Sequence, residues 1–188
     1  MFLVIGGHSN RGSDAASSQV LLVDMNEQSV QELPGLKYAR TYHSCASIDG
    51  NKILVSGGLP QGVYGQTTKI IPTELYDVNT GTSQDITDPV MTPRFGHSLV
   101  RLEQYVYAIG GETVGGLSSS SIERFDVKSG TWTKHPEALF SSSTAGLAVT
   151  TLPISAVGCD QGCQCGIAST KTERIVGGQE AEVPFSPF

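Results

Sequence analysis

Charged residues are scarce in this chain, and several kinds of segment are missing from it. Asp, Glu, Lys and Arg make up 16% of the 188 residues, and the formal net charge is −6. No two Lys or Arg residues are adjacent, so the sequence lacks the basic patches that bind nucleic acid or anionic membranes. No run of 18 apolar residues occurs, which predicts no membrane-spanning helix. We therefore expect neither nucleic acid nor a membrane as a partner.

The common catalytic and cofactor-binding motifs are also missing. No Gly-x-Ser-x-Gly elbow surrounds any serine, and no glycine-rich phosphate loop with a following Lys-Ser/Thr occurs. The sequence therefore predicts a chain that is not an enzyme and binds no cofactor or metal.

Glycine, by contrast, is abundant and regularly placed. The chain has 22 glycines, and three glycine doublets recur at steps of 51 and 53 residues. Each doublet ends a short apolar run, as Leu3 to Ile5 does before the first. A period near 50 residues indicates a repeat architecture built from short strands and tight turns. The doublets are Gly6-Gly7, Gly57-Gly58 and Gly110-Gly111.

Other residues repeat in step with the doublets. Arg40 and His43 recur 54 residues later as Arg94 and His97. For the two histidines we favour a structural role, hydrogen bonding beside the preceding arginine, over metal binding or acid–base chemistry. Asp49-Gly50 lies between two apolar runs and predicts a hairpin with positive φ angles. In each unit another strand ends in Asp (Asp24, Asp77, Asp126), and we expect a last strand to begin six residues later, at Val30, Ser83 and Trp132.

This pattern resembles the kelch repeat over residues 2–158. In that family a glycine doublet is followed by an aromatic residue and, about seven residues later, by Trp. Phe125 and Trp132 fit this pattern, whereas the middle unit has Tyr76 but Ser83 in place of Trp, and the first has Val23 and Val30. A fourth unit, residues 154–158, keeps one glycine of the doublet.

The resemblance implies an all-β fold, an incomplete kelch-type β-propeller over residues 1–158. It contains two complete four-stranded blades, at residues 40–88 and 94–136, with three strands before them and two after. The large aromatic side chains, Trp132 among them, fill the space between blades. Propellers close with about four to eight blades. We therefore expect the chain to be part of a longer product and, when expressed alone, to be poorly soluble or oligomeric, because its end blades expose apolar faces.

Resemblance to kelch proteins also implies a function. The variable loops after the doublets, residues 8–18, 59–69 and 112–120, would form the surface that binds a protein ligand. Their polar, glycine-rich composition agrees with a binding surface carried on loops. The sequence thus predicts a non-catalytic protein-interaction module.

The C-terminal residues 159–188 have a different character. They contain Cys159, Cys163 and Cys165, and then a run that resembles the activation junction of secreted trypsin-like serine proteases: Arg174, Ile175, Val176, Gly177 and Gly178. The resemblance implies cleavage after Arg174 by an activating trypsin-like protease, Ile175 as the new N-terminus, and a cysteine that tethers the propiece by a disulfide.

An alternative function follows from that junction: the chain would be the propiece end of a secreted zymogen. Residues 175–188 contain no His or Asp, so no Ser-His-Asp triad exists here and the protease domain would be missing. We favour disulfide formation over zinc binding for the three cysteines, since a closed zinc site needs four ligands. Residues 159–188 are rich in Gly, Ser, Thr and Pro, which predicts a flexible tail.

The sequence leaves the compartment open. Residues 1–7 lack a basic n-region and a long apolar run, so they are not a signal peptide. They look instead like the second strand of a repeat, entered in mid-unit. The tail weakly favours an extracellular location, whereas the N-terminus indicates a chain that is either cytosolic or incomplete.

Overall fold

Every regular element in the described residues is a β-strand. The computed structural model describes residues 1–10, 13–60, 71–87, 92–113, 117–135 and 148–151. The strands are β1 (Phe2–Ile5), β2 (His8–Asn10), β3 (Ser13–Ala16), β4 (Val20–Asp24), β5 (Ser29–Leu33), β6 (Ser44–Ser47), β7 (Lys52–Ser56), β8 (Thr73–Asp77), β9 (Thr82–Ile86), β10 (Arg94–Phe95), β11 (Ser98–Leu102), β12 (Tyr105–Ile109), β13 (Glu112–Thr113), β14 (Ile122–Asp126) and β15 (Thr131–Lys134). This part of the chain contains no helix that is long and apolar enough to cross a membrane.

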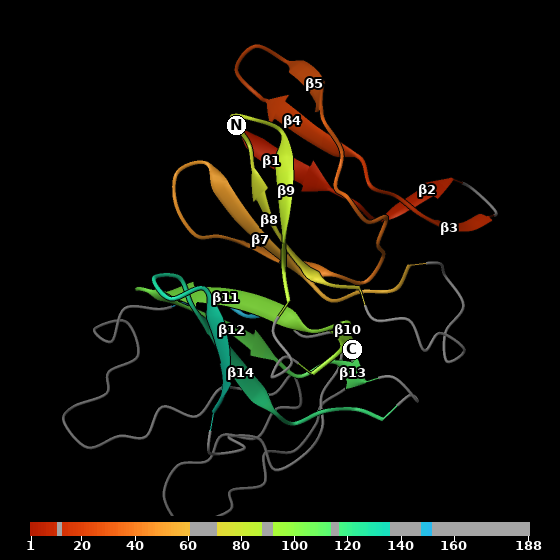
Figure 1. Cartoon of the computed structure of the whole chain (residues 1–188). Coiled ribbons are helices and arrows are strands. Elements are labelled where there is room, and N and C mark those ends of the chain that lie inside the picture. Colours follow the sequence, from red (N-terminus) through yellow and green to blue (C-terminus); the bar gives the residue numbers. More distant parts are fainter. Residues whose placement is uncertain (11–12, 61–70, 88–91, 114–116, 136–147, 152–188) are drawn as a thin grey trace, which may run out of the picture.

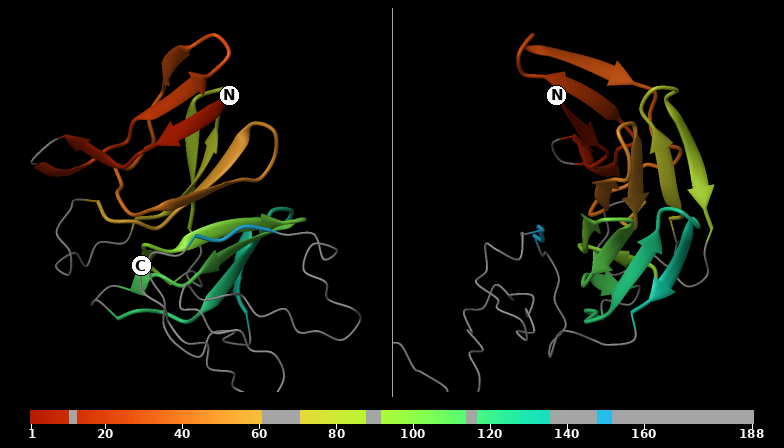
Figure 2. Two further views of the ribbon diagram at one scale, coloured as in Figure 1. Left: turned by 180° about the vertical axis from the view of Figure 1, so that it is seen from behind. Right: turned by 90° about the vertical axis from the view of Figure 1, so that its left-hand side faces the viewer.

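Three antiparallel sheets form the body of the molecule. Sheet 1 has the order β1-β4-β5, sheet 2 the order β6-β7-β8-β9, and sheet 3 the order β11-β12-β14-β15. They are stacked in chain order, with sheet 2 between the other two (Figure 1 and Figure 2). The predicted all-β fold with two four-stranded blades, preceded by three strands, is confirmed within the described residues.

The outermost strands begin one residue earlier than the sequence indicated. They start at Ser29, Thr82 and Thr131 rather than at Val30, Ser83 and Trp132. The reason is the pairing across each turn, since Asp24, Asp77 and Asp126 are paired with these three residues.

The recurring aspartates have a structural role that explains their spacing. Each one ends a strand, and its carboxylate accepts backbone N–H groups from the turn that follows. Asp77 Oδ1, for example, lies 2.9 Å from the Asn79 nitrogen and 3.1 Å from that of Thr80. Asp24 and Asp126 accept from the equivalent residues. These contacts reverse the chain between the last two strands of each sheet.

The hairpin at Asp49-Gly50 forms by the same means and not by the predicted one. Neither Asp49 nor Gly50 has a positive φ angle. Instead the Asp49 carboxylate accepts the backbone N–H groups of Asn51 at 3.1 Å and Lys52 at 2.8 Å. The β6–β7 hairpin was predicted correctly, but its turn is set by a side chain rather than by left-handed backbone.

Apolar side chains fill the space between successive sheets. Sheets 1 and 2 enclose a cluster that includes Val20, Val55 and Tyr76, and the Tyr76 hydroxyl donates to the Pro34 carbonyl oxygen at 2.8 Å. Sheets 2 and 3 enclose a second cluster with Leu54 and Trp132. Each core is therefore shared by two sheets, so a sheet in this stack does not bury both of its faces alone.

Two of the segments expected to be loops contain short strands. Residues 8–18 include the β2–β3 hairpin, and residues 112–120 include β13, which pairs with β10. Each pair forms a small two-stranded sheet of its own, separate from the three larger sheets. The predictions for residues 61–69, for the fourth unit at 154–158 and for the whole of 159–188 lie outside the described residues.

Candidate functional site

The glycine doublets and the recurring histidines pack against each other where the sheets meet. A Cβ atom at Gly57 would lie 2.6 Å from His97 Cε1, and one at Gly111 would lie 2.8 Å from His97 Cβ. His43 packs in the same way between Gly6 and Gly58, at 2.7 and 2.9 Å from the corresponding Cβ positions. Each histidine thus fills the room left by the first glycine of the preceding unit and the second glycine of its own.

His97 differs from the predicted hydrogen-bonding role. It is buried, and neither of its ring nitrogens has a hydrogen-bond partner among the described residues. Burial, together with the charge of Arg94, lowers the pKa of His97 to about 3. The ring is therefore a neutral packing group at neutral pH.

His43 keeps part of the predicted role. Burial and the charge of Arg40 lower the pKa of His43 to about 4, and hydrogen bonds with the backbone of Ile5 and Arg40 partly oppose this change. This ring is also neutral at neutral pH. The described residues contain no cluster of His, Cys, Asp or Glu suited to a metal ion.

Backbone hydrogen bonds join one repeat to the next beside these histidines. In the first two doublets the second glycine donates to the carbonyl oxygen of the recurring arginine of the next unit, Gly7 to Arg40 and Gly58 to Arg94, both at 2.9 Å. The Gly96 nitrogen donates to the Tyr42 oxygen at 2.8 Å. These contacts fix where the loops after the doublets leave the sheets.

A buried ion pair repeats in sheets 2 and 3. The Arg94 guanidinium lies 3.0 Å from Glu123, and both side chains are fully buried. Arg94 also donates to the Gly110 carbonyl oxygen at 2.8 Å, and Glu123 accepts the backbone N–H of Thr92 at 3.0 Å. The pair therefore binds the chain segment entering sheet 3 to a glycine of the doublet.

The equivalent pair in sheet 2 is Arg40 with Glu74. Arg40 donates to the Gly57 carbonyl oxygen at 2.9 Å, and Glu74 accepts the backbone N–H of Lys37 at 2.8 Å. Burial lowers the pKa of both arginines, and the paired carboxylates oppose that change. Since an unpaired buried charge is costly, loss of one partner would destabilise the whole junction.

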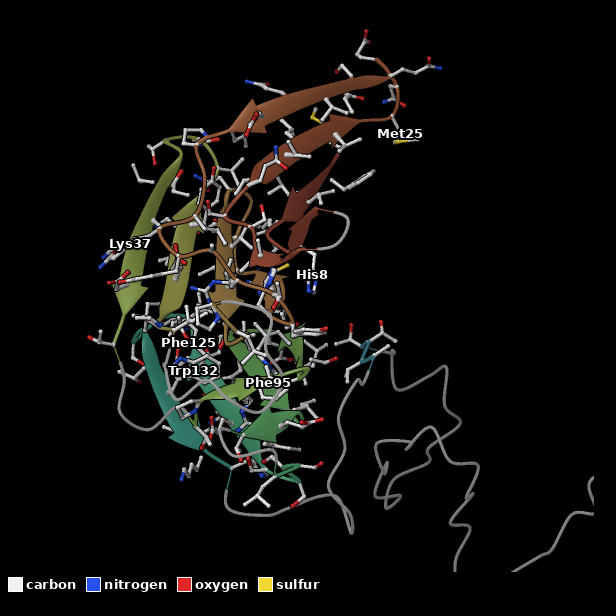
Figure 3. The ribbon with its side chains drawn as sticks, turned by 90° about the vertical axis from the view of Figure 1, so that its right-hand side faces the viewer. His8, Met25, Lys37, Phe95, Phe125 and Trp132 are labelled. Atoms are coloured by element: carbon white, nitrogen blue, oxygen red, sulfur yellow. The ribbon has the colours of Figure 1, made fainter. Side chains whose placement is uncertain are left out.

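The two glutamates were not predicted from the sequence, although a signal was present. Glu74 and Glu123 each lie two residues before the aromatic residue of their unit, Tyr76 or Phe125. Their recurrence, beside that of the arginines, indicates a paired charge. The predicted Trp132 position packs as the repeat implied: its ring is 2% exposed and lies 5.3 Å from the Phe125 ring centroid (Figure 3).

The segments that follow the doublets gather on one side of the stack, which we name the loop face. The β2–β3 hairpin and the β10–β13 pair both lie on the right in Figure 1, whereas the β6–β7 and β11–β12 turns lie on the left. The described residues of this face that follow the doublets are 8–10, 13–18, 59–60, 112–113 and 117–120. Residues 40–42 and 94–96 adjoin them, and of these Arg40, Thr41, Arg94 and Phe95 are buried.

An aromatic pair stands on the loop face. The rings of His8 and Tyr42 meet edge to face, with centroids 5.5 Å apart. Tyr42 is 38% exposed and has a φ angle of 53°, in the left-handed region that favours glycine. Its repeat equivalent is Gly96, with a φ angle of 62°. The chain therefore places a tyrosine where a glycine meets the same backbone requirement without strain.

The predicted disulfide and cleavage residues, Cys159, Cys163, Cys165 and Arg174 to Gly178, lie outside the described residues. The candidate site described here, the loop face, therefore consists only of residues that precede this C-terminal segment.

Known proteins share parts of this arrangement. Residues 93–137 match the family model of the kelch motif. A curated human protein, "Kelch repeat and BTB domain-containing protein 2", is 46% identical over 46 residues, which are 24% of this chain and 7% of that protein. The solved structure of YjhT has a TM-score of 0.64 at 16% identity, and the match covers 77% of this chain and 51% of that one.

The chain thus matches a small part of the curated relative and about half of the solved chain. The matched motif spans β10 to β15, the same residues that contain the Arg94–Glu123 pair and the Phe125–Trp132 contact. The chain therefore carries a kelch motif within an all-β fold of the kelch propeller type.

Proposed function

We propose that this chain is a non-catalytic protein-interaction module that binds a protein or peptide on its loop face. The kelch motif and the propeller-type fold support this function. The junctions between repeats also support it, because the buried ion pairs and the backbone hydrogen bonds give the loops a rigid base.

Tyr42 is the observation that carries the proposal. A left-handed conformation costs a residue other than glycine about 1–2 kcal/mol, and such strain is concentrated at functional positions. Tyrosine is also enriched among the residues that dominate binding energies, because it offers a large contact area with few rotatable bonds. The strained Tyr42, exposed beside His8, is therefore the proposed anchor for the ligand.

A glycine substitution tests this role with little risk to the fold. Tyr42→Gly keeps the left-handed backbone, as Gly96 does in the next unit, and removes the ring. We expect peptides selected from a displayed random library against the unchanged chain to bind Tyr42→Gly at least tenfold more weakly in calorimetry.

The control variant is Lys128→Ala, an exposed side chain in the β14–β15 turn, away from the loop face. It should bind the selected peptides with unchanged affinity. Equal affinity for all three proteins would show that Tyr42 is not the anchor, and failure to select any peptide would count against the module itself.

The zymogen alternative depends on the junction Arg174-Ile175 and on nothing in the described residues. If residues 159–188 are accessible, limited trypsin digestion cuts after Arg174, or after the neighbouring Lys171, before it cuts after Arg94, Arg101 or Arg124, which lie in strands. N-terminal sequencing of the first fragments decides this. Early fragments that start after the strand arginines, with Arg174-Ile175 intact, would remove the main support for an activation site.

A further inference from the structure

Sheet 1 has an apolar face on the side away from sheet 2. Leu3 and Ile5 of β1 point into the core shared with sheet 2, so the alternating residues Phe2 and Val4 point the other way. Phe2 is 50% exposed and Val4 is 45% exposed. Val30, in register with Phe2 through Val23, is 63% exposed. We name these four positions the open face: Phe2, Val4, Val23 and Val30.

The same repeat positions are buried in the other two sheets. In sheet 3 they are Val106, Ala108, Phe125 and Trp132, and all four belong to the core against sheet 2. In sheet 2 they include Val55 and Tyr76, which are 0% exposed in the core against sheet 1. The open face of sheet 1 thus corresponds to the surface by which sheets 2 and 3 each pack onto the sheet before them.

Sheet 3 presents the complementary surface at the other end of the stack. Sheet 2 contacts the Trp132 side of sheet 3 with Ala46, Ile48 and Leu54. The repeat equivalents in sheet 3 are Val100, Leu102 and Tyr107. Leu102 is 52% exposed, whereas Val100, Tyr107 and Val149 are partly buried against Ile109 and Ile122.

We propose that a second copy of this chain covers the open face, with sheet 3 of one copy packed on sheet 1 of the other. Each chain carries both halves of the contact, and both halves repeat a contact already made twice within the chain. A head-to-tail contact closes into a ring when its rotation allows. Two copies provide six sheets, within the range of about four to eight that closes a propeller.

The extent of the match to YjhT is compatible with two copies. One copy covers 51% of the solved chain that it resembles, so two copies have about its extent. The contact between copies does not depend on the proposed ligand-binding function, because the open face and the loop face are different surfaces.

Sedimentation velocity of the whole chain tests the proposal. We expect a species of twice the 19.8 kDa chain mass, with a population that rises with concentration. The double variant Phe2→Lys with Val4→Lys places charges on the open face and should be monomeric. The double variant Val100→Lys with Leu102→Lys changes the complementary side and should also be monomeric. Leu117→Lys, at a residue that is 72% exposed on the loop face, should remain dimeric.

Mixing the two monomeric variants identifies the geometry. In a head-to-tail pair one of the two contacts then joins an unchanged sheet 1 to an unchanged sheet 3, so the mixture should recover a dimer.

A symmetric contact between two copies of sheet 1 would leave the Val100→Lys with Leu102→Lys variant dimeric, and would overturn the proposal. A monomeric unchanged chain would overturn it as well, because the open face would then be covered by the chain itself or by nothing. Emission of Trp132, which lies between sheets 2 and 3, confirms that each variant is folded.

Discussion

At the scale of single residues, the fit between glycine and histidine holds the repeats in contact. Gly57 has a φ angle of 65°, and a Cβ atom there would lie 2.2 Å from the Arg94 carbonyl oxygen. Gly130 has a φ angle of 70°, but a Cβ atom there would meet nothing within 4 Å. The two glycines therefore share a backbone conformation and differ in whether another part of the chain occupies the adjacent space.

This difference predicts unequal effects of alanine. Gly130→Ala should cost about 1–2 kcal/mol, the penalty for a left-handed alanine. Gly57→Ala should cost about 1–3 kcal/mol more, because its methyl group overlaps backbone that cannot move freely. Urea unfolding of both variants measures the two costs. Equal losses of stability would show that the contact with Arg94 and His97 does not depend on the missing side chain.

The buried histidines predict a loss of stability in mild acid. His43 and His97 have folded-state pKa values of about 4 and about 3, below the value of about 6.5 expected in the unfolded chain. Between these limits the unfolded chain binds more protons, so stability is complete above about pH 6.5 and is lost as the pH falls. Each histidine contributes at most about 1.4 kcal/mol per pH unit.

Unfolding free energies at pH 7 and pH 5 measure this slope. His97→Asn should be less stable than the unchanged chain at pH 7, because it packs less well, but its stability should fall less between the two pH values. An unchanged slope in His97→Asn would show that His97 does not resist protonation in the folded chain.

At the scale of the elements, two kinds of contact join the sheets: polar contacts that hold single chain segments, and apolar contacts that extend across whole sheets. The Arg40–Glu74 and Arg94–Glu123 pairs fix the segments that enter sheets 2 and 3 to the glycine doublets. The aromatic residues fill the space between whole sheets, as Trp132 does beside Leu54 and Phe125. Trp132 and Val30 occupy equivalent positions in sheets 3 and 1, yet only Trp132 has a sheet against it among the described residues.

Truncating these two side chains to alanine should therefore reduce the free energy of unfolding by very different amounts. Trp132→Ala should cost about 3–5 kcal/mol, as expected for a large buried side chain. At concentrations low enough to keep the chain monomeric, Val30→Ala should change stability by no more than about 0.5 kcal/mol, because Val30 is 63% exposed in the single chain. Denaturant unfolding compares the two variants. The single Trp of the unchanged chain should emit at short wavelength, and a water-like emission maximum in the folded chain would contradict the buried position.

At the scale of the whole molecule, the repeated contact between sheets decides both the architecture and its open ends. Sheet 2 is covered on both sides, whereas sheets 1 and 3 each have one side without a partner sheet within the described ranges (Figure 2). The interior of the stack and the proposed contact between two copies therefore follow from one packing rule. The loop face lies to the side of this stacking direction, so the proposed contact between two copies does not use it (Figure 1).

Much of this arrangement was determined by the sequence. The doublets at 6, 57 and 110, the recurring aspartates and the aromatic residues predicted the repeat, the four-stranded sheets and the burial of Trp132, because each is a local pattern that recurs at a fixed interval. Residues that recur at a fixed interval have the same structural role in each unit, so their spacing predicts the repeated structure.

Only the tertiary structure decided what each repeated residue contacts. The sequence predicted hydrogen bonding for His97, but the folded chain packs its ring against glycines of two different units. No local pattern pairs Arg94 with Glu123, which are 29 residues apart and meet only when β14 lies beside the entry to sheet 3. The left-handed φ angle of Tyr42 was likewise not predictable from the residue type, because tyrosine does not itself favour that conformation.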